Sequence, residues 1–262
     1  MKLGIISDIH EDHLSLLKAM KILNKKQCDE IICLGDIVGF SVPFYKYYNS
    51  RNANECVSIV KANCKISVIG NHDLFAIRKT PSKAKTFMFP KNWYELEFDE
   101  RKEISQYKIW LYEESELSAM LNKNSKQYLL QLPESVVAKY EKLNILFTHY
   151  LSPDITGSTK WFISDASDFQ EHLQFIEENN CSYGFVGHAH IDGCLIVDNE
   201  KIKVRNFDSF TLKNKLQTVA LPCIARGKHL NGLLIFDTNS LQLEIVSLQS
   251  KWEIIRKIKL IG

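Results

Sequence analysis

The chain of 262 residues has no apolar run approaching the roughly 18 residues that a membrane-spanning helix requires. Its first residues, Met1 to Gly4, run directly into an apolar segment that reads as a strand, which leaves no room for a secretory signal. The seven cysteines have neither close paired spacing nor the spacing of a zinc finger, and their odd number argues against a disulfide framework. These absences predict a cytoplasmic protein with reduced thiols and no membrane partner.

The chain also has little excess of positive over negative charge. The formal net charge is only +2, which is too small to indicate nucleic acid as an obligate partner. We find no internal repeat, and 262 residues with 45% hydrophobic content suit one sizeable packed domain. We therefore expect a single domain over residues 1–262. The oligomeric state is left open.

Five short apolar runs are rich in β-branched or aromatic residues, and metal-binding residue types follow each of them. The runs cover residues 3–7, 30–34, 65–69, 144–148 and 183–186. Ligands gather beyond the carboxyl ends of strands in open α/β sheets, so side chains from all five places can converge. The candidate metal ligands are Asp8, His10, Asp36, Asn71, His149, His188 and His190.

The spacing within the motifs supports this interpretation. Asp8 with His10, and His188 with His190, are two residues apart, and such side chains point to the same face of an extended segment. Glycine, which has no Cβ and permits positive φ and close backbone approach, directly precedes other candidates. These glycines are Gly35, Gly70 and Gly187.

The donor types indicate which ions the site would hold. Four imidazoles, two carboxylates and one amide oxygen form a mixed nitrogen and oxygen set that suits first-row ions better than calcium or magnesium. Seven ligands are too many for one tetrahedral zinc, whereas two ions that share a carboxylate fit the number and serve in-line displacement at phosphorus. We expect two divalent metal ions, manganese foremost, with iron, nickel, cobalt or zinc as alternatives.

In order, the motifs Asp-x-His, Gly-Asp, Gly-Asn-His-Asp, His and Gly-His-x-His resemble those of the calcineurin-like metallophosphoesterase superfamily. The sequence around these motifs is similar to that of the small prokaryotic branch of phosphodiesterases and diadenosine tetraphosphatase-like proteins. The resemblance implies an α/β fold, a four-layer α-β-β-α sandwich of two mixed sheets flanked by helices. It also implies that Asp8, His10 and His190 hold one ion, that Asn71, His149 and His188 hold the second, and that Asp36 bridges both.

The same resemblance implies a catalytic role for His72, which acts on the leaving group or steadies the phosphoryl oxygens. A metal-bridging hydroxide would attack phosphorus in line. The implied activity is hydrolysis of a small phosphate-ester substrate, which is a phosphodiester, nucleotide or phosphomonoester. A nuclease of the same superfamily and a non-catalytic metal-binding interaction scaffold are the alternatives.

The chain departs from the pattern of the related protein phosphatases after Gly35-Asp36. Those proteins have an aspartate and an arginine a few residues on, whereas this sequence reads Ile37-Val38-Gly39-Phe40. The carboxylate that would orient His72 and the arginine that would clamp phosphate are both missing from that place, which disfavours a protein phosphatase.

Two other departures add charge near the site. His10 is followed by Glu11-Asp12, which places extra negative charge close to the expected metals. Arg226 lies in the loop after the last histidine motif, where its guanidinium fork suits phosphate oxygens. A surface arginine in a turn is the favoured reading by base rate. His229 likewise reads as part of a solvated turn.

A long insertion, at about residues 80–133, separates the third motif from the fourth, and we predict that most of it is helical. Its segment 92–119 has eight acidic and three basic residues. A solvated face is the favoured reading. The sharper hypothesis is a cap whose aromatic residues select the substrate: Phe87, Phe89, Trp93 or Tyr94. From about residue 193 the pattern turns to half-buried strands, the last over residues 252–259.

Overall fold

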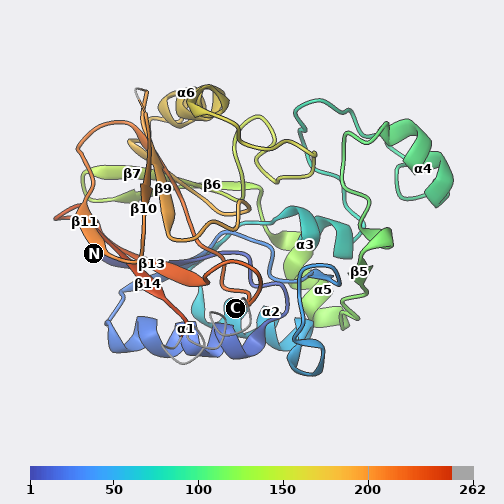
Figure 1. Cartoon of the computed structure of the whole chain (residues 1–262), viewed down its shortest axis with the longest axis horizontal. Helices are drawn as coiled ribbons and strands as arrows, with labels where there is room; N and C mark the ends of the chain where they lie inside the picture. The colour runs from blue at the N-terminus through green and yellow to red at the C-terminus, as the bar shows by residue number, and fades with distance from the viewer. Residues whose placement is uncertain (200, 250–262) are drawn as a thin grey trace, which may run out of the picture.

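Two six-stranded mixed sheets face each other, with helices on their outer faces (Figure 1). The computed structural model describes residues 1–199 and 201–249. The predicted four-layer sandwich is confirmed. The strand predicted over residues 252–259 lies outside the described residues.

The first sheet has the order β11-β14-β13-β1-β2-β4. Its strands are β1 (Lys2–Ile6), β2 (Glu30–Cys33), β4 (Ile66–Ser67), β11 (Ser209–Thr211), β13 (Gly232–Asp237) and β14 (Gln242–Ser247). β1, β2 and β4 run parallel, so their carboxyl ends lie at one edge. β13 pairs with β1 in the antiparallel direction and connects it to β14 and β11.

The second sheet has the order β10-β9-β12-β8-β7-β6. Its strands are β6 (Ser135–Tyr140), β7 (Leu143–Thr148), β8 (Tyr183–Val186), β9 (Cys194–Val197), β10 (Ile202–Arg205) and β12 (Gln217–Ala220). β7, β8 and β12 run parallel. All five strands predicted to precede candidate ligands are present, although β4 is only two residues long.

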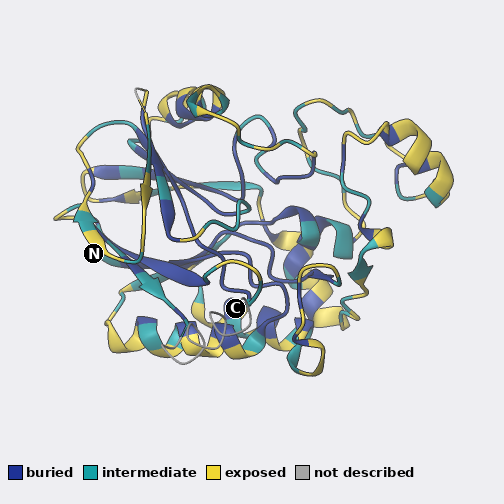
Figure 2. Ribbon diagram, viewed as in Figure 1, coloured by how far each residue is buried: buried dark blue, intermediate teal, exposed yellow. Residues whose placement is uncertain are grey.

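Alternation along β1 explains how the first sheet separates two cores. Leu3 and Ile5 join the cluster between the sheets, where Phe147, Phe185 and Phe236 are also fully buried. Ile6 points the opposite way, into the cluster beneath the helices, because successive side chains of a strand face opposite sides. Figure 2 shows this burial concentrated along the strands between the helical layers.

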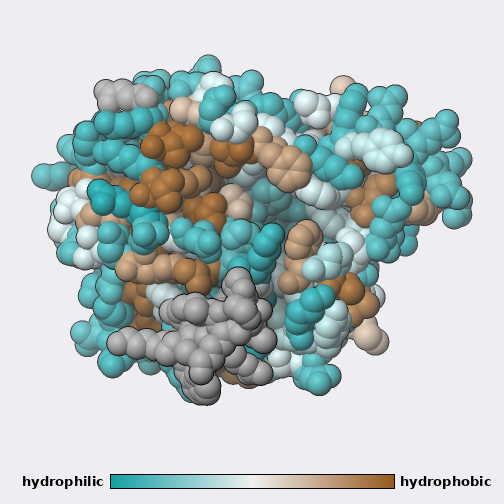
Figure 3. All heavy atoms as spheres, viewed as in Figure 1, coloured by the Kyte–Doolittle hydropathy of each residue, from teal (hydrophilic) through white to brown (hydrophobic). Residues whose placement is uncertain are grey.

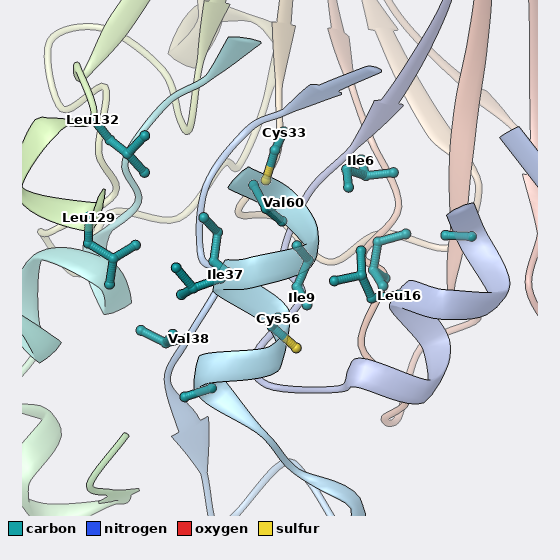
Figure 4. Close-up of a cluster of buried hydrophobic side chains, with 14 of the residues drawn as sticks. Ile6, Ile9, Leu16, Cys33, Ile37, Val38, Cys56, Val60, Leu129 and Leu132 are labelled. Carbon is teal, nitrogen blue, oxygen red and sulfur yellow. The ribbon is translucent and has the colours of Figure 1, made fainter. Parts of the chain in front are cut away.

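Helices cover both outer faces. Those of the structure are α1 (His13–Lys25), α2 (Ala53–Asn63), α3 (Asn71–Ala76), α4 (Phe98–Ser105), α5 (Lys123–Gln131) and α6 (Gln170–Glu178), with short 3₁₀ turns η1 (Tyr48–Ser50), η2 (Tyr112–Glu114) and η3 (Ala166–Phe169). Leu16 of α1, Val60 of α2 and Leu129 of α5 pack in one cluster with Ile6 (Figure 4). The Asp12 side chain caps α1 by accepting from the backbone N–H of Ser15 at 3.2 Å.

The insertion at residues 80–133 is less helical than predicted. It contains α4, η2, α5 and the two-residue strand β5 (Glu116–Leu117), and loops make up the remainder. Its first part folds around an aromatic cluster in which the rings of Phe87, Phe89 and Trp93 lie 4.9 to 5.5 Å apart. These tertiary contacts, together with Pro90, override the helical pattern. α4 projects from the molecule and is largely hydrophilic, as expected for a solvated face (Figures 1 and 3).

All seven cysteines are unpaired in the structure. Within residues 1–199 and 201–249, no helix is long and apolar enough to cross a bilayer.

His172, on α6, is a buried histidine outside the candidate site. Its Nδ1 accepts from the backbone N–H of Ser152 at 3.0 Å, and its Nε2 has no hydrogen-bond partner in the described structure. Burial lowers the pKa of His172 from 6.5 to about 3. The folded protein therefore excludes a proton that the unfolded chain binds below about pH 6.5, so stability falls as pH falls through this range.

Replacing His172 by glutamine should reduce this pH dependence, because glutamine still offers an acceptor to Ser152 but does not titrate. Between about pH 6.5 and pH 5, we expect the wild-type free energy of unfolding to drop by roughly 1.5 kcal/mol more than that of His172→Gln. Urea denaturation of both metal-free proteins at the two pH values measures the difference. Parallel losses would contradict a neutral His172.

Candidate metal centre

The loops that follow β1, β2, β4, β7 and β8 meet beyond the carboxyl ends of both sheets. They bring together every residue that the sequence singled out as ligand or catalyst: Asp8, His10, Asp36, Asn71, His72, His149, His188 and His190. The ligand atoms of all of these except Asn71 form three groups, and the atoms of each group lie within 4.8 Å of one another. The groups are Asp8, His10 and His190; His10, Asp36 and His72; and Asp36, His149 and His188.

Two members of the first group, Asp8 and His10, lie in the loop after β1. His190 Nε2 is 3.2 Å from Asp8 Oδ1 and 3.1 Å from His10 Nε2. His10 Nε2 is 3.9 Å from Asp8 Oδ1. Asp8 and His10 are fully buried, whereas the side chain of His190 is 26% exposed. This group is therefore reachable from solvent on the His190 side.

The group of Asp36, His149 and His188 lies at the ends of β2, β7 and β8, and Asn71, from the end of β4, contacts it. His188 Nδ1 is 3.1 Å from Asn71 Oδ1 and 3.3 Å from His149 Nε2. His149 Nε2 is 3.1 Å from Asp36 Oδ2. The same oxygen of Asp36 is 3.8 Å from His10 Nε2. Asp36 thus reaches both groups, which is the position that a bridging carboxylate requires.

Backbone carbonyls fix which nitrogen of the buried imidazoles faces the centre. His10 Nδ1 bonds to Gly39 O at 2.8 Å and His149 Nδ1 bonds to Leu34 O at 2.6 Å. Because a carbonyl accepts, Nδ1 must carry the proton, and Nε2 of each neutral ring presents a lone pair to the centre.

These donors fit divalent ions. Two donors that are each about 2.1 Å from one ion stand roughly 3.0 to 3.4 Å apart at octahedral or tetrahedral angles, and the shortest contacts in both groups are 3.1 to 3.3 Å. Several nitrogen and carboxylate lone pairs converging at such distances repel one another unless a cation or a proton lies among them. The residues present could therefore hold two metal ions.

The pKa values of the site reflect the same crowding. Burial lowers the pKa of both His10 and His188 to about 3, so both rings are neutral at neutral pH. Burial also opposes protonation of His149, but the Asp36 carboxylate outweighs it and raises the pKa of His149 to about 9. Burial likewise disfavours the Asp8 carboxylate, yet the neighbouring His190 holds its pKa below the usual value. Metal ions entering the site would displace these shared protons.

The backbone of the paired ligand candidates is left-handed and not extended, and this conformation directs their side chains. Asp8 and His10 have φ of 55° and 46°, and His188 and His190 have φ of 63° and 46°. The expectation that these pairs converge as alternate residues of an extended segment is therefore wrong. Asp36 adopts the same region, with φ of 51°. Such a cluster of strained non-glycine residues is typical of a functional site.

The glycines before the ligands have the predicted steric role. A Cβ at Gly187 would come 2.7 Å from Asp8 Oδ2, and a Cβ at Gly70 would collide with the Asp36 carboxylate. Any larger residue would displace a candidate ligand.

His72 lies at the open side of the centre. Its Nε2 is 3.9 Å from Asp36 Oδ2, its side chain is 15% exposed, and its Nδ1 contacts Glu116 Oε1. Burial would lower the pKa of His72, but the charges of Glu116 and Asp36, together with the hydrogen bond to Glu116, outweigh it and raise the pKa above its usual value. The ring of Tyr112 lies 4.5 Å from that of His72, and the Tyr112 hydroxyl contacts Asn71 Nδ2.

Sequence reasoning missed both Glu116 and Tyr112. The missing carboxylate after Gly35-Asp36 signalled that His72 needed a partner from elsewhere. Nothing in the acidic insertion distinguished Glu116 from its neighbours, because the strand that carries it is two residues long.

The additional charges around the centre are paired with one another. Arg226 Nε is 2.8 Å from Asp12 Oδ2, and Arg226 Nη2 is 2.9 Å from Asp12 Oδ1. Glu11 is 3.5 Å from Arg51. The guanidinium of Arg226 thus forms a bidentate ion pair with the Asp12 carboxylate at the start of α1. His229 is 3.7 Å from Asp192 and about half exposed.

The aromatic residues of the insertion pack mainly on one another. Trp93 is 2% exposed, and the guanidinium of Arg101 lies 5.7 Å from its ring centre. A cavity of about 20 Å³, with Asn71, Phe89, Trp93 and Tyr94 among its lining residues, separates this cluster from the centre. It has room for about one water molecule. In this structure the cluster forms the core of the insertion.

A family model described as the calcineurin-like phosphoesterase superfamily domain matches residues 1–206. The chain belongs to this superfamily. Among solved structures, this calcineurin-like phosphoesterase is similar to a metallophosphoesterase from Sphaerobacter thermophilus, with a TM-score of 0.63 and 19% identity, covering 99% of this chain and 94% of the other. A hypothetical protein from Pyrococcus horikoshii gives a TM-score of 0.58 and 18% identity, covering 99% and 92%. Both likenesses support the fold.

One curated relative is similar over a shorter stretch. It is an uncharacterized protein of Methanocaldococcus jannaschii, 36% identical over 78 residues, or 29% of this chain. The match spans 28% of the length of that relative.

Proposed function

We propose that this calcineurin-like phosphoesterase is a metal-dependent hydrolase of a small phosphate ester, which is a phosphodiester, nucleotide or phosphomonoester. The observation that carries the proposal is the position of Asp36 Oδ2, which is 3.1 Å from His149 Nε2 and 3.8 Å from His10 Nε2. One carboxylate oxygen therefore reaches both groups of donors, as a site for two ions needs.

The assignment of residues follows the two groups. Asp8, His10 and His190 would hold one ion, Asn71, His149 and His188 would hold the other, and Asp36 would bridge them. When bound, such ions polarise phosphoryl oxygens and lower the pKa of a water molecule to near neutrality. Manganese is the first ion to test.

The chain's own residues orient the ester and handle the proton of the leaving group. His72, His188 and His190 are the partly exposed members of the centre, so the substrate would enter on the side that these three rings line. His72 Nε2 faces the centre, where it would donate a proton to the leaving oxygen as the bond from phosphorus to that oxygen breaks.

Hydrolysis of p-nitrophenyl phosphate and bis(p-nitrophenyl) phosphate tests the proposal. Metal-stripped protein resupplied with manganese should turn over at least one of them. On the corresponding phenyl ester, whose leaving group needs protonation, His72→Ala should lower kcat by about 10² to 10⁴, the range of general acid catalysis. The preferred ester then decides between monoester and diester.

His229→Ala is a matched control, because this histidine is exposed and lies beside Asp192. It should retain wild-type turnover. Turnover that does not depend on metal, or phenyl-ester turnover that is undiminished in His72→Ala, would contradict the proposal. Cleavage of oligonucleotides with no activity on small esters would favour the nuclease instead.

A further inference from the structure

Glu116 brings a buried carboxylate to His72 from a distant part of the chain. It lies on β5 within the insertion, 44 residues after His72, and its Oε1 contacts His72 Nδ1. The side chain of Glu116 is only 3% exposed. A carboxylate removed from water in this way is costly unless it is paired and hydrogen-bonded. Among the described residues, His72 is the only side chain within hydrogen-bonding distance of the Glu116 carboxylate.

A two-stranded ribbon fixes the backbone of Glu116. β5 pairs in the antiparallel direction with β3 (Phe40–Ser41), with Ser41 opposite Glu116 and Phe40 opposite Leu117. The backbone N–H of Val42 also donates to Ser115 O at 2.8 Å. The position of Glu116 is therefore set by main-chain hydrogen bonds and not by a flexible loop.

The same ribbon receives the His72 ring. Gly39 immediately precedes β3 and has φ of 95°, and a Cβ built there would come 2.5 to 2.8 Å from Cβ, Cγ and Nδ1 of His72. The imidazole thus lies directly against the Gly39 backbone. The residue before β3 therefore lies against the His72 ring on one side. β3 also pairs with β5, which carries the Glu116 carboxylate that contacts the same ring.

We propose that Glu116 is the positioning residue of His72, supplied by the insertion in place of the carboxylate that is missing after Gly35-Asp36. Its contact keeps a proton on Nδ1 and turns Nε2 toward the centre, where Nε2 is 3.9 Å from Asp36 Oδ2. During hydrolysis the Nε2 proton passes to the leaving oxygen as the P–O bond breaks, the Nδ1 proton stays with His72 and Glu116, and solvent water returns a proton to Nε2. This inference rests on the proposed hydrolysis.

Aryl phosphodiesters with different leaving groups test the inference in manganese-loaded protein. A phenolate leaving group needs protonation far more than a p-nitrophenolate does. Glu116→Gln should therefore lower kcat for phenyl esters by about 10-fold more than kcat for p-nitrophenyl esters, with KM and metal content unchanged. His72→Ala should show at least the same selective loss.

Glu114→Gln is the matched control. This glutamate lies two residues earlier in the insertion, is 53% exposed and pairs with Lys102 at 2.7 Å. It should leave the rates on both esters unchanged. Equal losses on both esters in Glu116→Gln would show that Glu116 only supports the fold, and would overturn the proposal.

A second readout does not depend on turnover. In zinc-loaded protein, nitrogen–proton correlation spectra should show a downfield Nδ1 proton of His72 that disappears in both His72→Ala and Glu116→Gln. Its persistence in Glu116→Gln would overturn the proposal. If no ester is hydrolysed, the proposed function fails, and loss of this signal in Glu116→Gln still supports the positioning contact.

Discussion

Replacement of Asp36 by asparagine is expected to lower kcat for ester hydrolysis by at least about 10³-fold. The substitution keeps the size of the side chain but removes the charge of the one carboxylate whose Oδ2 reaches both His149 and His10. Both proposed ions would lose a ligand together. Steady-state kinetics with manganese and the number of metal ions per chain measure the effect.

Asp192→Asn is the control for that experiment, because Asp192 is 53% exposed and lies beside His229. It should keep wild-type kcat and metal content. If Asp36→Asn binds two ions and turns over as the wild type does, Asp36 is not the bridge, and the assignment of the two groups must be rejected.

Removal of the metal ions is expected to lower the melting temperature by roughly 8 to 16 °C relative to protein held at about 1,000 times the dissociation constant. A ligand at that excess stabilises the folded state by about 4.1 kcal/mol. Without ions, the converging donors of His10, Asp8 and His190 repel one another or must share protons. The folded state is therefore stabilised when ions enter.

Calorimetry of chelator-treated protein, before and after titration with manganese, gives this difference. His149→Ala should abolish most of the shift, whereas His13→Ala, which is a histidine outside the centre, should not. A melting temperature that does not change with metal would contradict metal binding by the folded chain.

The sequence predicted the parts of this architecture that have a local signal. Alternating and continuous apolar runs located the strands β1, β2, β7 and β8, and the carboxyl-end rule predicted where Asp8, Asp36 and His149 would meet. The direction of approach was not predictable, because the left-handed φ of Asp8 and Asp36 is imposed by the loops that pack against them. Glycine before a ligand signals close approach without specifying the conformation of the ligand itself.

Contacts that produce no periodic pattern in the sequence were not predicted. Glu116 contacts His72 through a two-residue strand whose partner is also two residues long. Arg226 and Asp12, which are 214 positions apart, form a bidentate ion pair. From the sequence, Arg226 was expected to be a surface residue and Asp12 a negative charge near the site. The insertion was expected to be mostly helical, but Phe87 and Trp93 pack into a tertiary cluster instead. In each case distant partners determine the local structure.

The position of β13 has a consequence for synthesis of the chain. β1 precedes the first candidate ligand, Asp8, yet one of its two neighbours in the sheet is β13, with Lys2 opposite Asp237. A nascent chain that has emerged only to His190 contains every candidate ligand but leaves β1 unpaired on one side. Because a ribosome adds about 5 to 20 residues per second, the remaining 47 residues up to Asp237 take several seconds. The sheet that carries the candidate ligand Asp8 is therefore completed only after β13 has been synthesised.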